Sequence, residues 1–196
     1  LTAGNTDQGN DVILGDNGQA LFDSEGVLRS ISSSDPNVGD TDLIITGGGN
    51  DVIIGGYQTD TIHSEQDDDT VVGDNGRALF ADNNVPVDVY TTAPNDGADD
   101  TIYAHQGRDV VLGGADSDKI ITYNLSAADP VSETDQDVVL GDHGRVTFEA
   151  DGSILTFETT DPTIGDQDLI YTGNGGDVIA GGTAADTIYG RIYYTD

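Results

Sequence analysis

The stretch Gly47-Gly48-Gly49-Asn50-Asp51-Val52-Ile53-Ile54-Gly55-Gly56 contains the unit from which the rest of the chain is built. It joins a glycine-rich turn, an aspartate, three residues that favour β-strands, and small residues that open the next turn. The core returns nine residues later as Asp60-Thr61-Ile62, and after nine more as Asp69-Thr70-Val71. A short fixed period of this kind indicates a repeat fold of stacked turns.

An aspartate opens each copy of this core, and all copies share one register. The copies begin at Asp11, Asp42, Asp51, Asp60, Asp69, Asp100, Asp109, Asp118, Asp137, Asp168, Asp177 and Asp186. Most intervals are 9 residues, but three are 31 residues: Asp11 to Asp42, Asp69 to Asp100 and Asp137 to Asp168. These excursions produce a larger repeat of about 58 residues, as from Asp11 to Asp69. The corresponding interval from Asp69 to Asp137 is 68 residues, ten more than the larger repeat, and we expect the ten extra residues near 122–131.

The residue two positions after each aspartate is always Ile or Val, and the residue four positions after it is always Gly, Ser, Thr or Ala. A β-branched residue at one fixed position suits a very short strand with a single side chain pointing inward. Glycine at the turn positions suits a positive φ or a close approach between backbones. The pattern predicts a parallel β-solenoid of about twelve short strands and no helix of useful length.

The composition is strongly acidic, with 37 Asp and Glu against 6 Lys and Arg, a net charge of −31. Such self-repulsion favours disorder, but disorder predicts no register, so we expect the chain to need cations in order to fold. A salt-adapted organism also favours an acidic surface. The charge argues against nucleic-acid binding, and no apolar run reaches the length of a membrane span, roughly 18 residues. The absence of Cys suits a protein that is exported unfolded.

Each 22-residue excursion reads as a β-hairpin, at about 15–38, 73–96 and 141–164. The excursions start from similar tetrapeptides: Gly15-Asp16-Asn17-Gly18, Gly73-Asp74-Asn75-Gly76 and Gly141-Asp142-His143-Gly144. Two β-rich runs then flank a cluster of Asp, Asn or Gly, and a proline ends the second run. All three hairpins leave from strands of one predicted sheet, and this sheet has mostly apolar outward positions, such as Val52 and Ile54. We therefore predict that the hairpins cover that sheet and form a second core.

The glycine-rich turn, the aspartate and the x-(Ile/Val)-x strand resemble the nonapeptide calcium-binding repeats of RTX (repeats-in-toxin, hemolysin-type) proteins. The resemblance covers most of the chain outside the hairpins. It implies an all-β fold, a right-handed parallel β-roll in which calcium ions lie between neighbouring turns on both sides. We expect residues 1–196 to form a single such domain with three inserted hairpins packing on one sheet. We also expect the domain to be part of a larger protein.

The resemblance implies which residues bind calcium. They are the twelve aspartates above, together with Gly47, Gly49, Gly55, Gly107, Gly113, Gly173, Gly175 and Gly181. No turn carries all three glycines of the family pattern, and in several turns the third is replaced by an acid: Asp40, Asp67, Asp116, Asp135 or Asp166. Calcium takes six to eight oxygen ligands and mixes carboxylates with backbone carbonyls, which these turns supply. Sites of mixed quality are therefore expected.

Simpler interpretations exist for single residues. An aspartate before a strand can simply make an Asx-turn hydrogen bond, although twelve in register favour calcium. We expect His63, His105 and His143 to be surface residues rather than ligands. No metalloprotease motif, nucleophile elbow or phosphate-binding loop occurs, so we expect no enzymatic activity.

The other predicted sheet has mixed outward positions such as Thr101/Tyr103 and Leu169/Tyr171. It is either an ordinary solvated face or a flat contact surface. The sequence therefore predicts a secreted or cell-surface calcium-binding module that folds on calcium and supports the structure or type I secretion of a larger protein. The alternative is an adhesin module whose Thr/Tyr face binds a surface, a glycan or ice. A third interpretation is the folding tail of a secreted hydrolase. Besides calcium, the expected partners are a surface ligand or flanking domains.

Overall fold

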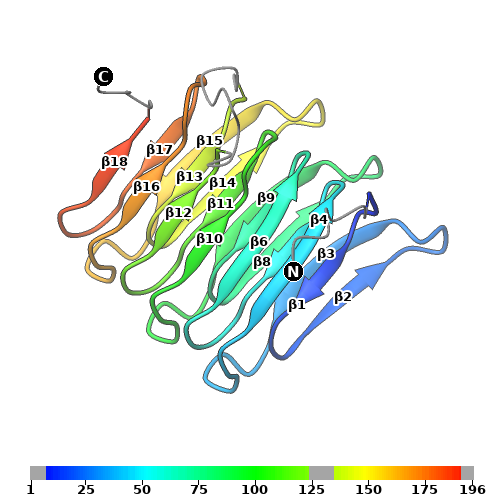
Figure 1. Ribbon diagram of the computed structural model, residues 1–196. Coiled ribbons are helices and arrows are strands. Elements are labelled where there is room, and N and C mark those ends of the chain that lie inside the picture. The colour runs from blue at the N-terminus through cyan, green and yellow to red at the C-terminus, as the bar shows by residue number, and fades with distance from the viewer. Residues whose placement is uncertain (1–7, 124–134, 191–196) are drawn as a thin grey trace.

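The computed structural model describes residues 8–123 and 135–190. Within these ranges the regular elements are β-strands, and no helix there has the length and apolar character that a membrane crossing needs. The chain advances in one direction from its N-terminal to its C-terminal strands, and the hairpins lie along one side of the stack (Figure 1). Most of the predicted ten-residue insertion near 122–131 lies outside the described residues.

Two parallel sheets form the solenoid, as the nine-residue period predicts. The first sheet contains β1 (Val12–Leu14), β5 (Val52–Ile54), β7 (Thr70–Val72), β11 (Val110–Leu112), β13 (Val138–Leu140) and β17 (Val178–Ala180), in that order. The second contains β4 (Leu43–Gly48), β6 (Thr61–Gln66), β10 (Thr101–Tyr103), β12 (Lys119–Ile121), β16 (Leu169–Tyr171) and β18 (Thr187–Tyr189). Successive short strands alternate between the sheets, which confirms the predicted parallel β-roll architecture.

The space between the two sheets is filled by the predicted column of β-branched residues. Neighbouring strands pair in strict register, so that Ile53 lies beside Val71 and Ile62 beside Ile102. Each of these four side chains is fully buried. Burial of the column decreases at its C-terminal end, where Ile188 on the last strand is 43% exposed. Burial of one Ile or Val per turn stabilises the stack by about 1.5–3 kcal/mol per side chain.

The three hairpins together make a third layer. They consist of β2 (Gly18–Phe22) with β3 (Leu28–Ser33), β8 (Gly76–Phe80) with β9 (Pro86–Thr91), and β14 (Gly144–Phe148) with β15 (Ile154–Thr159). Neighbouring hairpins also pair, β3 with β8 and β9 with β14, so the layer is one six-stranded antiparallel sheet. The sequence predicted the separate hairpins but not this continuous sheet.

The third layer covers the first sheet, as predicted. Phe80 and Phe148 pack with Ile54 and Leu112 in one buried apolar cluster. The first hairpin covers less, because Phe22 remains 52% exposed. The outward apolar positions from β1 to β13 are therefore part of a second core rather than a surface.

The third residue of the second and third launching tetrapeptides joins the bases of neighbouring hairpins. The Asn75 side-chain amide donates to the carbonyl of Asp96 in its own excursion (2.8 Å) and to that of Pro36 in the preceding one (3.0 Å). His143, the equivalent residue, lies 3.2 Å from the Pro94 carbonyl through Nε2. The prediction of a surface position was wrong for His143, which is 1% exposed, because this position faces the junction between two hairpins.

Candidate metal sites

The twelve predicted aspartates stack into two ladders, one along each edge of the solenoid. In each ladder the backbone amide of one aspartate donates to Oδ1 of the aspartate in the next turn on the same edge, at 2.7–3.2 Å. These bonds join residues 18 to 50 positions apart, as from Asp51 to Asp69 and from Asp118 to Asp168. The Oδ1 atoms therefore join successive turns rather than closing local Asx turns.

The second oxygen of many ladder aspartates has no such partner. Among the described residues, these Oδ2 atoms are buried without a hydrogen bond in Asp60, Asp69, Asp100, Asp109, Asp118 and Asp168. A buried carboxylate without compensation costs several kcal/mol, so these oxygens call for a positive charge or a proton. Within residues 8–123 and 135–190, these oxygens are strong candidates for metal ligands.

Burial also raises the pKa values of these carboxyls. The pKa of Asp60 rises to about 7, mainly through burial and in part through the charges of Asp42 and Asp16. Burial raises the pKa of Asp168 to about 8, although the Asp118 amide lowers it. The pKa of Asp118 is raised well above its ordinary value by burial and by the charges of Asp100 and Asp74. Without a cation, these groups would hold protons near neutral pH.

One edge of the solenoid, here called the glycine edge, opens every turn with a glycine. It comprises residues 15–41, 55–59, 73–99, 113–117, 141–167 and 181–185, which open with Gly15, Gly55, Gly73, Gly113, Gly141 and Gly181. A Cβ on Gly55 would lie 2.1 Å from the carbonyl oxygen of Gly73 and 2.6 Å from Asp60 Oδ2. A Cβ on Gly113 would lie 2.2 Å both from the Gly141 carbonyl oxygen and from Asp118 Oδ2. Each such glycine leaves room for a carbonyl and a carboxylate oxygen to converge.

The opposite edge, here called the hydroxyl edge, opens most turns with Thr or Ser. It comprises residues 46–50, 64–68, 104–108, 122–123 with 135–136, and 172–176, which open with Thr46, Ser64, Ala104, Thr122 and Thr172. The Thr172 hydroxyl donates to Asp177 Oδ2 at 2.7 Å, and the Thr122 hydroxyl bonds Asp137 Oδ2 in the same way. At these two turns a threonine hydroxyl donates a hydrogen bond to the aspartate Oδ2 atom. In the buried aspartates of the glycine edge the equivalent Oδ2 atom has no hydrogen-bond partner.

The predicted glycines of the hydroxyl edge allow backbone carbonyls of neighbouring turns to approach closely. A Cβ on Gly107 would lie 1.9 Å from the Asp67 carbonyl oxygen, and one on Gly175 would lie 1.8 Å from that of Asp135. Gly49 similarly faces the Gly9 carbonyl, and Gly47 and Gly173 have positive φ. Glycine here lets the turns stack closely.

The acids that replace the third glycine are not part of the ladders. The Asp67 carboxylate accepts from the Gly49 amide at 3.2 Å, and the Asp135 carboxylate from the Gly107 amide at 3.3 Å. Asp40 and Asp166 accept from the next residue's amide and are exposed, and Asp116 is exposed with φ of 63°. These five predicted candidates therefore lie at the rim of the turns, apart from the buried oxygens.

Three further aspartates, absent from the predicted candidates, belong to the glycine edge. Asp74, fully buried, accepts from the amide of Ala98 at 3.1 Å and from that of Ala115. Equivalent pairs of bonds are made by Asp16, to Asp40 and Tyr57, and by Asp142, to Asp166 and Thr183. Each carboxylate holds the end of its own excursion against the next turn. The threefold Gly-Asp-(Asn/His)-Gly tetrapeptide was the signal that could have identified them.

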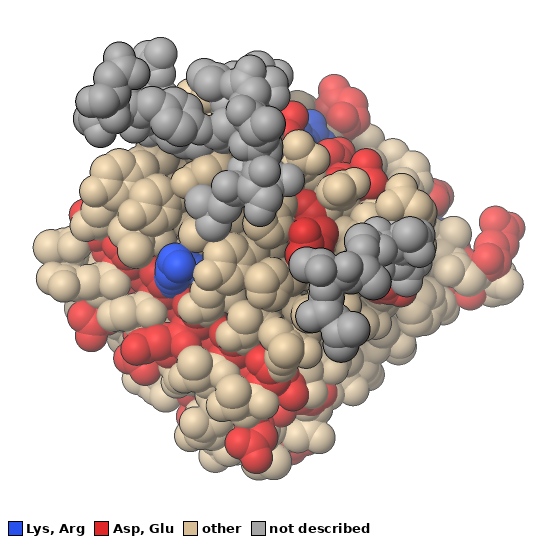
Figure 2. All heavy atoms as spheres, viewed as in Figure 1, with Lys and Arg blue, Asp and Glu red and all other residues tan. Residues whose placement is uncertain are grey.

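Negative charge therefore accumulates between the turns. On the face shown in Figure 2, acidic side chains are numerous and basic ones are few. At the glycine edge, the ladder aspartates Asp60, Asp100 and Asp168 each interact electrostatically with the nearest tetrapeptide carboxylate. An uncompensated cluster of this kind opposes stacking unless cations lie within it.

A family model supports the same conclusion from the sequence. The model of the RTX calcium-binding nonapeptide repeat matches in four copies, over residues 38–77, 96–121 and 165–191. The chain contains RTX calcium-binding nonapeptide repeats. Searches of curated proteins and of solved structures found no match.

RTX nonapeptide repeats bind calcium, and several repeats imply several ions. The residues of this RTX chain fit that group, because the glycine-edge turns bring aspartate carboxylate and glycine carbonyl oxygens together, the oxygen ligands that calcium prefers. The unpaired Oδ2 atoms and the glycine positions that no side chain could occupy are the two observations that support the fit.

Proposed function

We propose that this RTX chain is a folding-on-calcium segment of a larger secreted protein. The observation that carries the proposal is the row of buried Asp Oδ2 atoms without hydrogen-bond partners at the glycine edge. Their desolvation opposes folding of the metal-free chain, and a cation removes that cost. Free energy of calcium binding thereby becomes free energy of folding.

The ligand assignment follows from the same geometry. On the glycine edge we assign the Oδ2 atoms of Asp42, Asp60, Asp100, Asp118, Asp168 and Asp186 to calcium, with glycine carbonyls of neighbouring turns as further ligands. On the hydroxyl edge, Asp69 and Asp109 are candidates with an unpaired buried Oδ2. Asp137 and Asp177, which are bonded by threonine hydroxyls, would bind more weakly.

The proposed location is extracellular. Calcium sites in extracellular modules commonly have dissociation constants of about 10⁻⁴–10⁻³ M, so they are empty inside cells and filled outside. A chain with a net charge of −31 and no cysteine suits export in the unfolded state, as in type I secretion. The proposed role is structural and involves no catalytic step.

Calcium titration tests this function. The chelated chain should show a disordered far-UV circular dichroism spectrum and a large hydrodynamic radius. Millimolar calcium should produce a cooperative transition to a compact β-sheet protein, while the same concentration of magnesium, which keeps its water ligands, should not. A compact β-sheet spectrum that persists in excess chelator at neutral pH would refute folding on calcium.

A second candidate function is contact with a flat ligand through the outer face of the second sheet. The observation in its favour is the apolar and aromatic exposure there. Leu43 and Ile45 are 68% and 58% exposed, and the Tyr171 and Tyr189 rings stack with centroids 4.8 Å apart. If this face is adhesive, Tyr171→Ser should abolish attachment of the calcium-folded protein to glycan, ice or mineral surfaces without changing its spectrum. Unchanged attachment would exclude this face.

A further inference from the structure

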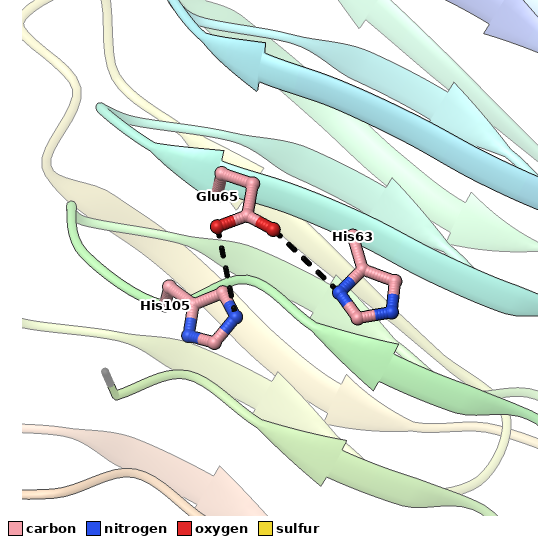
Figure 3. A group of neighbouring side chains, drawn as sticks. All are labelled: His63, Glu65 and His105. Carbon is pink, nitrogen blue, oxygen red and sulfur yellow. Dashed lines mark ion pairs between the residues drawn. The ribbon is translucent and has the colours of Figure 1, made fainter. Parts of the chain in front are cut away.

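A group of nitrogen and oxygen ligands lies where the outer face of the second sheet meets the hydroxyl edge, and none of its members is a ladder aspartate. His63 and Glu65 belong to β6, and His105 follows β10 in the neighbouring turn. One Glu65 oxygen lies 3.6 Å from His63 Nδ1, and the other lies 3.8 Å from His105 Nε2 (Figure 3). One ligand atom from each residue can be chosen so that all three lie within 4.8 Å of one another. The three side chains thus converge on one point, although His105 is far from the other two in the sequence.

Two of these residues occupy a backbone position that otherwise holds glycine. The position lies four residues before the next ladder aspartate, and its φ is 79° in Glu65 and 67° in His105. In the other short turns of residues 8–123 and 135–190 this position is glycine with positive φ: Gly47, Gly56, Gly114, Gly173 and Gly182. Residues other than glycine are disfavoured in this conformation. Stacking of the turns therefore does not explain why two adjacent turns carry Glu and His here.

The surroundings orient the two imidazoles. The Tyr103 ring stacks on His63 with centroids 4.6 Å apart and lies 5.9 Å from the His105 ring. Tyr103 is itself held by Lys119, whose Nζ donates to the phenol oxygen at 3.2 Å. The His63, Glu65 and His105 side chains are 29%, 38% and 13% exposed, so an ion could reach them from solvent.

The donor set selects a different ion from the ladders. Calcium prefers oxygen ligands, whereas two imidazoles with one carboxylate suit zinc and similar transition metals. Zinc bonds to nitrogen and oxygen are about 2.0–2.2 Å, so neighbouring ligands of a tetrahedral site lie about 3.3–3.6 Å apart. The separations of 3.6 and 3.8 Å involve different Glu65 oxygens, and one ligand atom from each of the three residues lies within 4.8 Å of the others, so small side-chain rotations would bring the three atoms to that spacing.

We propose that His63, Glu65 and His105 bind one divalent transition-metal ion, with zinc as the representative ion. Three protein ligands leave the fourth tetrahedral position to water. The site would hold together the turn after β6 and the turn after β10, next to a Gln66–Gln106 bridge that already joins them. It is independent of the calcium ladders and of the role proposed above.

The test is zinc titration of the tag-free protein, kept folded by saturating calcium and followed by isothermal titration calorimetry. One zinc ion per chain should bind, and His63→Ala or His105→Ala should weaken that binding at least tenfold. Glu25→Gln, which removes an exposed carboxylate from a hairpin turn, should leave it unchanged and serves as the matched control. Circular dichroism in calcium checks that each variant has the wild-type fold.

A second measurement does not depend on the variants. Cobalt(II), which replaces zinc in such sites, should give the visible absorption of a tetrahedral complex with the calcium-loaded wild-type protein. The proposal is overturned by either of two results. These are no zinc or cobalt binding at saturating calcium, and binding that the folded histidine variants retain at full affinity.

Discussion

The glycine edge and the hydroxyl edge each carry a ladder of aspartates, but turns of the two edges can differ in what lies next to the aspartate Oδ2 atom. At the glycine edge, Gly113 leaves room for the Gly141 carbonyl and Asp118 Oδ2 to converge, and that Oδ2 atom has no hydrogen-bond partner. At the hydroxyl edge, Thr172 fills the corresponding space and donates to Asp177 Oδ2. In this pair of turns, the residue five positions before the aspartate decides whether a carboxylate oxygen is left for an ion, as in Asp118, or is bonded by the protein, as in Asp177.

A shared register therefore does not make equivalent sites. The tetrapeptide aspartates Asp16, Asp74 and Asp142 add charge to the glycine edge alone, since each is bonded to two of its turns. We expect calcium to stabilise the glycine edge more strongly, and the following changes test that asymmetry in order of decreasing effect.

Gly113→Ala should have the largest effect. Its Cβ would meet two oxygens at 2.2 Å, so one turn must move, and we expect a loss of about 3 kcal/mol in the free energy of unfolding at saturating calcium. Urea unfolding followed by circular dichroism measures it. The control Gly26→Ala has open space around its Cβ and only an unfavourable φ of 84°, which costs about 1–2 kcal/mol. Equal losses in the two variants would show that the close approach at Gly113 is unimportant.

Neutralising one ladder aspartate on each edge compares the sites directly. Asp118→Asn removes the charge of an unpaired buried oxygen, and we expect the calcium midpoint for folding to rise at least tenfold, or about 1.4 kcal/mol. Asp177→Asn should raise the midpoint less, because Thr172 already bonds that carboxylate. Calcium titrations monitored by circular dichroism give both midpoints. A larger shift for Asp177→Asn would reverse the proposed order of the edges.

The dependence of folding stability on pH should change sign when calcium is bound. Burial raises the folded-state pKa of Asp69 and Asp60 to about 7 and that of Asp168 to about 8, against 3.8 for the unfolded chain. The folded metal-free chain then binds protons that the unfolded chain releases. Its stability should be highest below about pH 4 and fall as the pH rises to about 8.

With calcium bound the same carboxylates are ionised, so acid should weaken the folded state instead. Circular dichroism of metal-free protein at pH 5 and pH 8, with and without calcium, measures both trends. Asp118→Asn should reduce the pH dependence of folding in metal-free protein. A metal-free chain that is more ordered at pH 8 than at pH 5 would contradict the assignment of these groups.

Thr172→Val should have the smallest effect. It removes the hydroxyl that donates to Asp177 Oδ2 and keeps the shape of the side chain, so we expect a loss of about 1 kcal/mol. Differential urea unfolding at saturating calcium measures it. An increase in stability with calcium would indicate that the hydroxyl competes with an ion at this edge.

Much of the fold follows from the sequence because each turn repeats one set of physical requirements. Ile53 and Val71 could be placed in the core because every turn has one inward position, and Gly55 could be placed in a site because its turn admits no side chain. The family pattern pointed to the ladder aspartates, and the bonds between turns place their Oδ1 atoms as structural acceptors.

The rest depends on contacts that the nine-residue register does not contain. Asp74 lies within an excursion, and its partners Ala98 and Ala115 are 24 and 41 residues away. The hairpins pair into one sheet only because the larger repeat brings them side by side. His105 meets Glu65 because both hold the same position in neighbouring turns, a signal that becomes visible only once the order of stacking is known.

Whether ions lie between the stacked turns can be seen in a crystal structure grown with calcium, through the anomalous scattering of the ion. We predict calcium peaks at the glycine edge, about 2.3–2.6 Å from the Oδ2 atoms of Asp60, Asp100, Asp118 and Asp168. An ordered glycine edge whose Oδ2 atoms face only water or protein hydrogen-bond donors, at saturating calcium, would contradict calcium-driven folding of this chain.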